Sequence, residues 1–453
     1  MTDLGLEKRP PRDVRSRFSG ISAPAFGRRG RRPATPCQLL GGTVKLMSAG
    51  RWSLCVVLGV LASLVLLVGS CPASGSPPSG GSTESAGRAV VSIAAGGYSG
   101  YALLGDRQVW AWGDDLEGQI GVAGQWFQTT VPVEVGGLNG AVAIAGGQNT
   151  GYAVLQDGTV WAWGDNGQDE LGNAGDLSRQ VPVEVHPLSK IVTIDAGAFS
   201  VYALRRDGTV WTWGDNGFGQ LGTGSSDPGP GAPHELTRLG GVTALAGGAS
   251  NGYALLRDGT VWAWGDNGLG QLGVPPCTSS AGPSSTCLFS SVPVQVPGVA
   301  GAIALASSWD TAYALLRDGT VLAWGDNGLG QLGSGAHKPS SDTPVRVRGL
   351  GQVVAISAGS ETGYALDRQG NLWAWGYGGY GQLGDGSAAN SDVAVRVRKL
   401  SHVIRVAGGG DMAYALDRQG NLWAWGYGGY GQLGDGSVVS LDLPTRVVGL
   451  PSR

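Results

Sequence analysis

Short apolar runs separated by glycine-rich turns follow one another from residue 89 almost to the end of the chain. One unit contains four runs of strand length, which are VTALAG (242–247), YALLR (253–257), TVWAW (260–264) and VPVQV (292–296). Asp258 and Gly259 separate the second run from the third, which predicts a two-residue hairpin turn with positive φ at both residues. Pro293 predicts that the fourth run is an edge strand, because proline cannot donate a hydrogen bond to a neighbouring strand. The pattern therefore predicts four antiparallel strands in each unit.

The same unit recurs in seven copies along the chain. Each copy has a Tyr-Ala pair, which starts at Tyr101, Tyr152, Tyr202, Tyr253, Tyr313, Tyr364 or Tyr414. A tryptophan follows 11 residues later, at Trp112, Trp163, Trp213, Trp264, Trp324, Trp375 or Trp425. The period is 50 or 51 residues, except for 60 between the fourth and fifth copies, and counterparts of the fourth strand lie at 131–135, 181–185, 343–347, 393–397 and 443–447. These repeats predict an all-β, seven-bladed β-propeller of four-stranded antiparallel blades, with an open solenoid as the alternative.

The phrase YALLRDGTVWAWGDNGLGQLG (253–273) resembles the repeat of the regulator of chromosome condensation family, whose bacterial members are often called alpha-tubulin suppressor-like. The resemblance covers residues 89–450 and implies the propeller fold. One feature departs from it: many family repeats carry a histidine in the loop before the second strand. The histidines of this chain lie elsewhere, at His186, His234, His337 and His402.

The N-terminal part has the pattern of an export signal. Residues 54–68 are an uninterrupted apolar run, and VGSC ends at Cys71 like a lipobox, so lipidation of Cys71 is predicted. We therefore expect a signal peptide or membrane anchor at 47–70, a flexible linker at 71–88 and the propeller at 89–450, which places the protein at the cell surface or membrane. The basic extension 1–46 would lie upstream of a translation start at Met47. In an exported protein, Cys277 and Cys287 are expected to form a disulfide around the long insertion.

Charge and motifs exclude several classes of function. Residues 71–453 hold 20 Lys or Arg and 31 Asp or Glu. This part of the chain therefore lacks the excess of positive charge that is typical of nucleic-acid-binding proteins. GLGQLG (268–273) has the G-x-G-x-x-G spacing of a dinucleotide-binding turn, but no helical pattern follows it. Its glycines are therefore interpreted as turn residues that leave room between blades. No recurring Ser/His/Asp or Cys/His set and no cluster with metal-ligand spacing is found, so we predict no enzyme, no cofactor and no metal.

The tryptophans are interpreted mainly as core residues. Thirteen of the 16 occupy the two slots of the repeated W-x-W-G motif, where Leu322 replaces one. Alternate positions of a strand share one face, so both slots are expected to pack against the next blade. Trp126, Phe127 and Trp309 fall outside the slots and are candidate surface residues.

Functional residues are expected where the copies differ, because packing fixes the scaffold positions. The loop before each Tyr-Ala strand varies most, and a propeller gathers such loops on one face. The candidate partner-binding residues are Tyr98, Gln148, Asn149, Phe199, Asn251, Trp309, Asp310, Glu361 and Asp411. Aromatic residues beside acidic ones favour a protein-binding module. We expect the module to be a monomer. The family also includes a secreted bacterial inhibitor of β-lactamases, which suggests a β-lactamase or penicillin-binding protein as partner. The alternatives are nucleotide exchange on a small GTPase, as in the family's namesake, and cell-wall carbohydrate binding.

Overall fold

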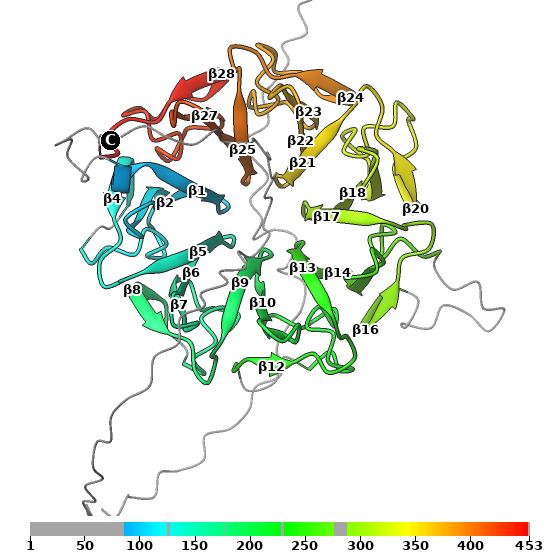
Figure 1. Ribbon diagram of the computed structural model, residues 1–453, viewed down its shortest axis with the longest axis horizontal. Helices are drawn as coiled ribbons and strands as arrows, with labels where there is room; N and C mark the ends of the chain where they lie inside the picture. Colours follow the sequence, from blue (N-terminus) through cyan, green and yellow to red (C-terminus); the bar gives the residue numbers. More distant parts are fainter. Residues whose placement is uncertain (1–85, 125–126, 176, 228–230, 276–287, 452–453) are drawn as a thin grey trace, which may run out of the picture. The chain divides into compact units, whose positions relative to one another are not determined.

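The computed structural model describes residues 86–124, 127–175, 177–227, 231–275 and 288–451. They form seven four-stranded antiparallel sheets, arranged as blades around a central axis (Figure 1). The first strand of each blade lies nearest the axis, and the other three follow outward in chain order. The first strands of the first and last blades, β1 (Val90–Ala95) and β25 (Val403–Gly408), contact each other, so the ring is closed. The predicted seven-bladed propeller is confirmed, and the open solenoid is not the fold.

The strands have the following bounds. The remaining first strands are β5 (Ala141–Gly146), β9 (Ile191–Ala196), β13 (Val242–Gly247), β17 (Ala302–Ser307) and β21 (Val353–Ala358). The second strands are β2 (Ser99–Leu104), β6 (Thr150–Leu155), β10 (Ser200–Arg205), β14 (Asn251–Leu256), β18 (Thr311–Leu316), β22 (Thr362–Asp367) and β26 (Met412–Asp417). The third strands are β3 (Val109–Asp114), β7 (Val160–Gly164), β11 (Val210–Gly214), β15 (Val261–Asp266), β19 (Val321–Asp326), β23 (Leu372–Gly376) and β27 (Leu422–Gly426). The outer strands are β4 (Gln128–Glu134), β8 (Arg179–Glu184), β12 (His234–Glu235), β16 (Phe289–Gln295), β20 (Ser340–Arg346), β24 (Ser391–Arg396) and β28 (Leu441–Arg446), and a short 3-10 helix, η1 (Ala86–Arg88), precedes β1.

The hairpin between the second and third strands differs from the prediction. In blade 4, Leu256 N donates to Thr260 O at 2.9 Å, which leaves three residues in the loop instead of two. Gly259 has φ +82°, whereas Asp258 is not among the described residues with positive φ. The Asp258 carboxylate accepts the Thr260 N–H at 2.9 Å and so holds the turn in an ordinary right-handed conformation. The expected two-residue turn is therefore wrong, and the loop is a turn closed by one left-handed glycine.

Tyrosine, tryptophan and glutamine join each blade to the next. Between blades 3 and 4, the backbone carbonyl of Gln220 accepts hydrogen bonds from Tyr202 OH at 2.8 Å and from Trp264 Nε1 at 2.7 Å. The two rings meet edge to face, with centroids 5.8 Å apart. Trp264 is fully buried, while Trp262 on the same strand is half-buried. The repeated tryptophan thus packs against the preceding blade, and the expectation that it faces the next blade is wrong.

The ring closes through the same joint. Trp112 of the first blade donates to Gln432 O of the last blade at 2.9 Å, and Tyr414 OH also donates to this carbonyl. The rings of Trp112 and Tyr414 are edge to face at 5.4 Å. The first and last blades share no sheet, since each described sheet consists of four consecutive strands, so this side-chain joint helps to hold them together.

Blade 2 keeps the joint, because the Glu170 carbonyl accepts hydrogen bonds from Tyr152 OH at 3.0 Å and from Trp213 Nε1 at 2.8 Å. Its side chain differs chemically, because Glu170 stands where the other six copies have glutamine. In blade 3, Gln220 Nε2 donates to Asp215 Oδ2 at 2.8 Å, a bond that an ionised glutamate cannot make. Glu170 is buried, with 2 % of its surface exposed. Burial, reinforced by the charges of Asp165 and Asp215, raises the pKa of Glu170 to about 7.

The substitution Glu170→Gln is expected to stabilise the protein at neutral and alkaline pH. The raised pKa means that ionising Glu170 opposes folding, so wild-type stability falls as pH rises from about 4.5 through about 7. The variant lacks this loss, and its advantage in free energy of unfolding should grow across this window to on the order of 2–3 kcal/mol. Urea unfolding at pH 4.5 and pH 8 measures it. The converse variant Gln220→Glu should lose stability mainly at pH 8, and a pH-independent effect in either variant would refute this account.

Candidate functional site

The loops between the first and second strands and those between the third and fourth strands lie on one side of the ring. In blade 1, Ser99 at the start of β2 pairs with Gly113 near the end of β3, so both connections leave the sheet together. We call this side the upper face. The lower face carries the hairpins between the second and third strands and the connections between blades. The variable loops identified in the sequence are therefore brought together on the upper face.

A closed ring of backbone hydrogen bonds surrounds the axis at the upper face. In each blade, the N–H of one loop residue donates to a carbonyl of the next blade at 2.8–3.2 Å; the donors are Gly97, Gln148, Ala198, Ala249, Trp309, Ser360 and Gly410. The cavity at this channel mouth has a volume of about 80 Å³ and is lined mainly by glycine, alanine and serine. That volume is well below the roughly 300–1,000 Å³ of a small-molecule pocket. The ring of backbone hydrogen bonds therefore has a structural role, because it joins each blade of the propeller to the next.

The nine predicted binding residues have different surroundings. Gln148 and Trp309 line the channel mouth. Asn251 is fully buried and donates through Nδ2 to Asp266 O at 2.5 Å, so its side chain belongs to the scaffold. Asp310 accepts a hydrogen bond from Gln271 Nε2 at 3.3 Å. The half-buried members of the set are Tyr98, Asn149, Phe199, Trp309, Asp310, Glu361 and Asp411.

Five tyrosines form a continuous cluster across blades 6, 7 and 1. We call Tyr98, Tyr377, Tyr380, Tyr427 and Tyr430 the tyrosine cluster; successive ring centroids are 5.9 Å apart for Tyr377–Tyr380, 5.0 Å for Tyr380–Tyr427, 5.9 Å for Tyr427–Tyr430 and 5.3 Å for Tyr430–Tyr98. Tyr430 is the most open of them, with 36 % of its surface exposed. Only Tyr98 was predicted. The other four could have been found from the two copies that read WGYGGYGQLG, where tyrosines replace both the aspartate and the leucine of WGDNGLGQLG.

Asp411 lies beside the tyrosine cluster, because its backbone carbonyl accepts the Tyr427 N–H at 2.8 Å. Its Oδ1 accepts a hydrogen bond from Gln382 Nε2 at 3.3 Å. Burial raises the pKa of Asp411 to about 6. Burial and then the Asp411 charge raise the pKa of Tyr98, which places the two side chains in one electrostatic environment. At neutral pH, Asp411 is therefore a carboxylate held in a partly dehydrated aromatic setting.

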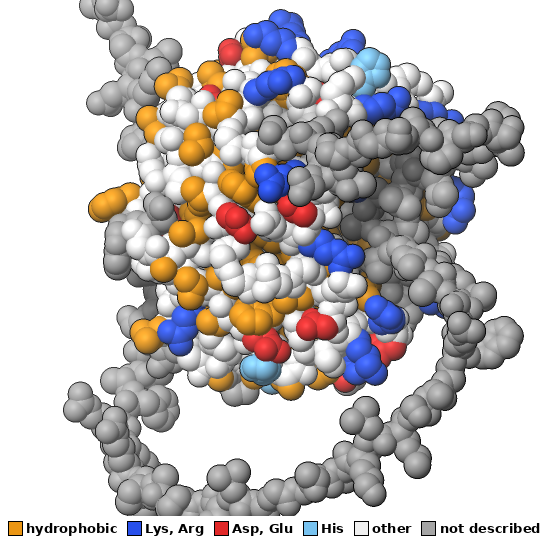
Figure 2. Space-filling view, turned by 60° about the vertical axis from the view of Figure 1, so that its left-hand side comes forward, with side chains coloured by type: hydrophobic (Ala, Val, Ile, Leu, Met, Phe, Trp, Pro, Cys, Tyr) orange, Lys and Arg blue, Asp and Glu red, His pale blue; other side chains and the backbone are white. Residues whose placement is uncertain are grey.

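Acidic side chains gather on the upper face. The loops between first and second strands contain Asp310, Glu361 and Asp411 but no lysine or arginine, and the third strands add Asp114, Asp266 and Asp326 at their upper ends. The hairpins of the lower face carry charges of both signs: the arginines are Arg107, Arg206, Arg257, Arg317, Arg368 and Arg418, and the aspartates are Asp106, Asp157, Asp207, Asp258, Asp318, Asp367 and Asp417. In the view of Figure 2, most of the visible Lys and Arg side chains lie in the right-hand half, with Asp and Glu side chains among them. The upper loops are thus acidic, whereas the lower hairpins carry both charges.

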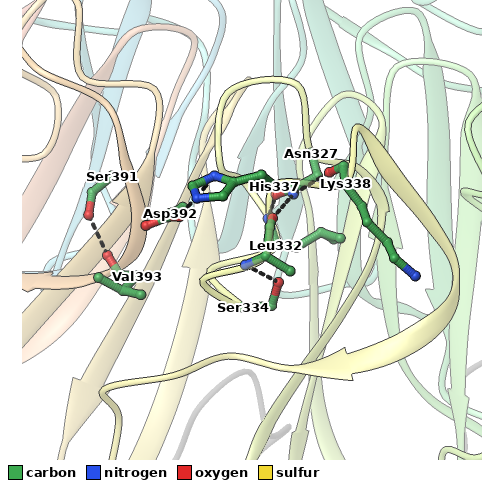
Figure 3. Close-up of polar contacts among 9 residues, drawn as sticks. Asn327, Leu332, Ser334, His337, Lys338, Ser391, Asp392 and Val393 are labelled. Carbon is green, nitrogen blue, oxygen red and sulfur yellow. Dashed lines mark hydrogen bonds and ion pairs between the residues drawn. The ribbon is translucent and has the colours of Figure 1, made fainter.

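The repeated Asp-Asn pair of the upper loops is structural. Asp326 Oδ1 accepts the Gly328 N–H at 3.0 Å, and Oδ2 accepts from Gln331 Nε2 at 2.9 Å. Asn327 accepts the Leu332 N–H at 3.0 Å and donates to Lys338 O at 2.6 Å (Figure 3). Across the blade boundary, His337 Nδ1 lies 3.6 Å from Asp392 Oδ2. These contacts fix the loop backbone and leave the variable side chains to differ.

Several predictions fall outside the described residues: the basic extension, the signal or anchor, the lipidated Cys71, the disulfide between Cys277 and Cys287, and Trp126. Phe127 is 73 % exposed, as expected of a surface residue. In the described ranges, no helix has both the length and the apolar character that a bilayer span requires. The same ranges hold no group of three or more His, Cys, Asp and Glu able to bind a metal ion.

Known proteins resemble both the sequence and the fold. Among curated relatives, human Protein RCC2 is 31 % identical over 160 residues, which are 34 % of this chain and 29 % of the relative. The RCC2 homolog of Danio rerio is 31 % identical over 140 residues, 31 % and 27 % of the two chains. This chain thus matches less than a third of the length of these relatives.

Solved structures share the propeller fold. Human WBSCR16 has a TM-score of 0.66 at 23 % identity, covering 76 % of this chain and 94 % of that one. Yeast RCC1 (Prp20), in a structure of Kap60 bound to it, has a TM-score of 0.66 at 20 % identity, covering 85 % and 91 %. Residues 69–352 match the model of the RCC1-like domain, and residues 369–416 and 419–453 match the regulator of chromosome condensation (RCC1) repeat. With its seven closed blades and their shared Tyr-Trp-Gln joint, the chain belongs to the RCC1 repeat family.

Proposed function

We propose that this chain is a protein-binding module that contacts its partner through the upper face of the propeller. The proposal rests on one observation: the variable aromatic and acidic loop residues gather on that face. The repeated residues, in contrast, pack within and between the blades. Relatives support a binding role in general: one solved structure concerns Prp20p of Saccharomyces cerevisiae and its binding to Gsp1p and histones, and in another Kap60 is bound to yeast RCC1.

We further propose that the module is exported and tethered to a membrane, as the apolar run 54–68 and Cys71 suggest. Mass spectrometry of the mature N-terminus tests this, because a lipidated Cys71 is the expected product and an intact N-terminus in the cytosol would refute it. A β-lactamase or penicillin-binding protein is the partner to try first. Nucleotide exchange on a small GTPase is the second candidate, favoured by the RCC1 family itself, and a nucleotide-release assay separates the two.

Binding through the upper face can be tested with matched variants. The upper variant Trp309→Ala with Phe218→Ala removes two aromatic side chains of that face, and the lower variant Arg257→Ala with Arg317→Ala changes two exposed hairpin residues. In capture from the native host's envelope fraction, quantified by mass spectrometry, the upper variant should lose specific partners by more than about fivefold. The lower variant should retain them. Equal capture by both variants, with thermal unfolding unchanged, would contradict the proposal.

A further inference from the structure

We infer that the tyrosine cluster and Asp411 form a binding site for a cationic side chain, arginine or lysine, of a protein partner. This inference rests on the proposed function and identifies one contact of the upper face. The site spans blades 6, 7 and 1, so it exists only because the ring closes and brings Tyr98 against Tyr427 and Tyr430, with centroids 6.3 and 5.3 Å apart.

The aromatic part of the site attracts cations. The face of a tyrosine ring is the negative end of its quadrupole, and it attracts a cation that lies within about 6 Å of the ring centroid. The five rings pack edge to face or tilted in one continuous patch, and Tyr430 has 36 % of its surface exposed. A planar guanidinium or an ammonium group can rest on this patch without displacing it.

The carboxylate part of the site favours the same ligand. Asp411 is half-buried, and its hydrogen-bond donor, Gln382, is neutral. In the part of the chain that the structure describes, Asp411 forms no ion pair with a lysine or arginine, whereas Asp310 and Glu361 add negative charge in the two preceding blades. A partly dehydrated carboxylate is strongly stabilised by a charge-assisted hydrogen bond. Acidic loops around it also attract a basic partner at long range.

A labelled hexa-arginine peptide is a suitable probe for the full chain, with fluorescence anisotropy at low salt as the readout and hexa-glutamine as the neutral control. Wild-type protein should bind hexa-arginine and not hexa-glutamine. Asp411→Asn and Tyr430→Leu should each weaken binding about threefold to tenfold, whereas Tyr430→Phe keeps the ring and should stay within about twofold. Asp435→Asn removes one charge from the same face outside the site and should also stay within about twofold.

Two results would overturn the inference. Equal weakening by Asp411→Asn and Asp435→Asn would mean that the peptide senses only the total charge of the face. Absence of hexa-arginine binding to wild type would remove the site altogether. Neither result touches the capture experiment on Trp309 and Phe218, which lie outside the tyrosine cluster, so failure of this site and failure of the proposed function are distinguishable.

Discussion

Replacing Trp264 with alanine is expected to lower the free energy of unfolding by about 3–5 kcal/mol, the range for deleting a fully buried large aromatic side chain. Trp264 has no exposed surface, and its Nε1 donates across the blade boundary to Gln220 O at 2.7 Å. The change removes both the apolar contact and one of the two hydrogen bonds that join blades 3 and 4. Urea unfolding followed by circular dichroism measures the loss.

Trp262 provides a matched control on the same strand and the same face. It is half-buried, and its Nε1 has no hydrogen-bond partner among the described residues. Trp262→Ala therefore loses only part of a side-chain burial, about 1–2 kcal/mol. If both variants lost the same stability, the joint between Tyr202, Trp264 and Gln220 would not hold the blades together.

The architecture was predictable because the spacing of Tyr-Ala, Trp and Gly is fixed in every copy, and seven units close well into a ring. The sequence did not predict which neighbouring blade the tryptophans contact. Strand alternation shows that Trp262 and Trp264 share a face, but it carries no information on which neighbouring blade that face meets. The prediction of a two-residue hairpin turn was wrong for a local reason. The Asp258 side chain accepts the Thr260 N–H and favours the longer, three-residue turn.

The candidate site was predictable only in part. Repeat equivalence alone brings Tyr98 and Asp411 to one face, since both precede a second strand. The burial of Asn251 could not be read from its loop, because it depends on the carbonyl of Asp266 lying beside it. The tyrosine cluster needed ring closure, which sets the first blade against the last and is invisible in any single repeat.

Replacing Gly270 with alanine is expected to destabilise the propeller, whereas replacing Gly268 in the same GLGQLG turn is expected to be tolerated. Gly270 has φ +83°, and an added Cβ would lie 2.7 Å from Asp342 Cα of the next blade. The strained backbone and the collision are each expected to cost about 1–3 kcal/mol. At Gly268 no positive φ is needed and the nearest atom, Asp266 Oδ1, is 3.5 Å away, so the change should stay within about 0.5 kcal/mol. Thermal unfolding of the two variants distinguishes a blade turn from a phosphate-binding turn. If the glycines served to bind a ligand, replacing either one would leave stability unchanged. If they make room for the next blade, replacing Gly270 lowers stability and replacing Gly268 does not.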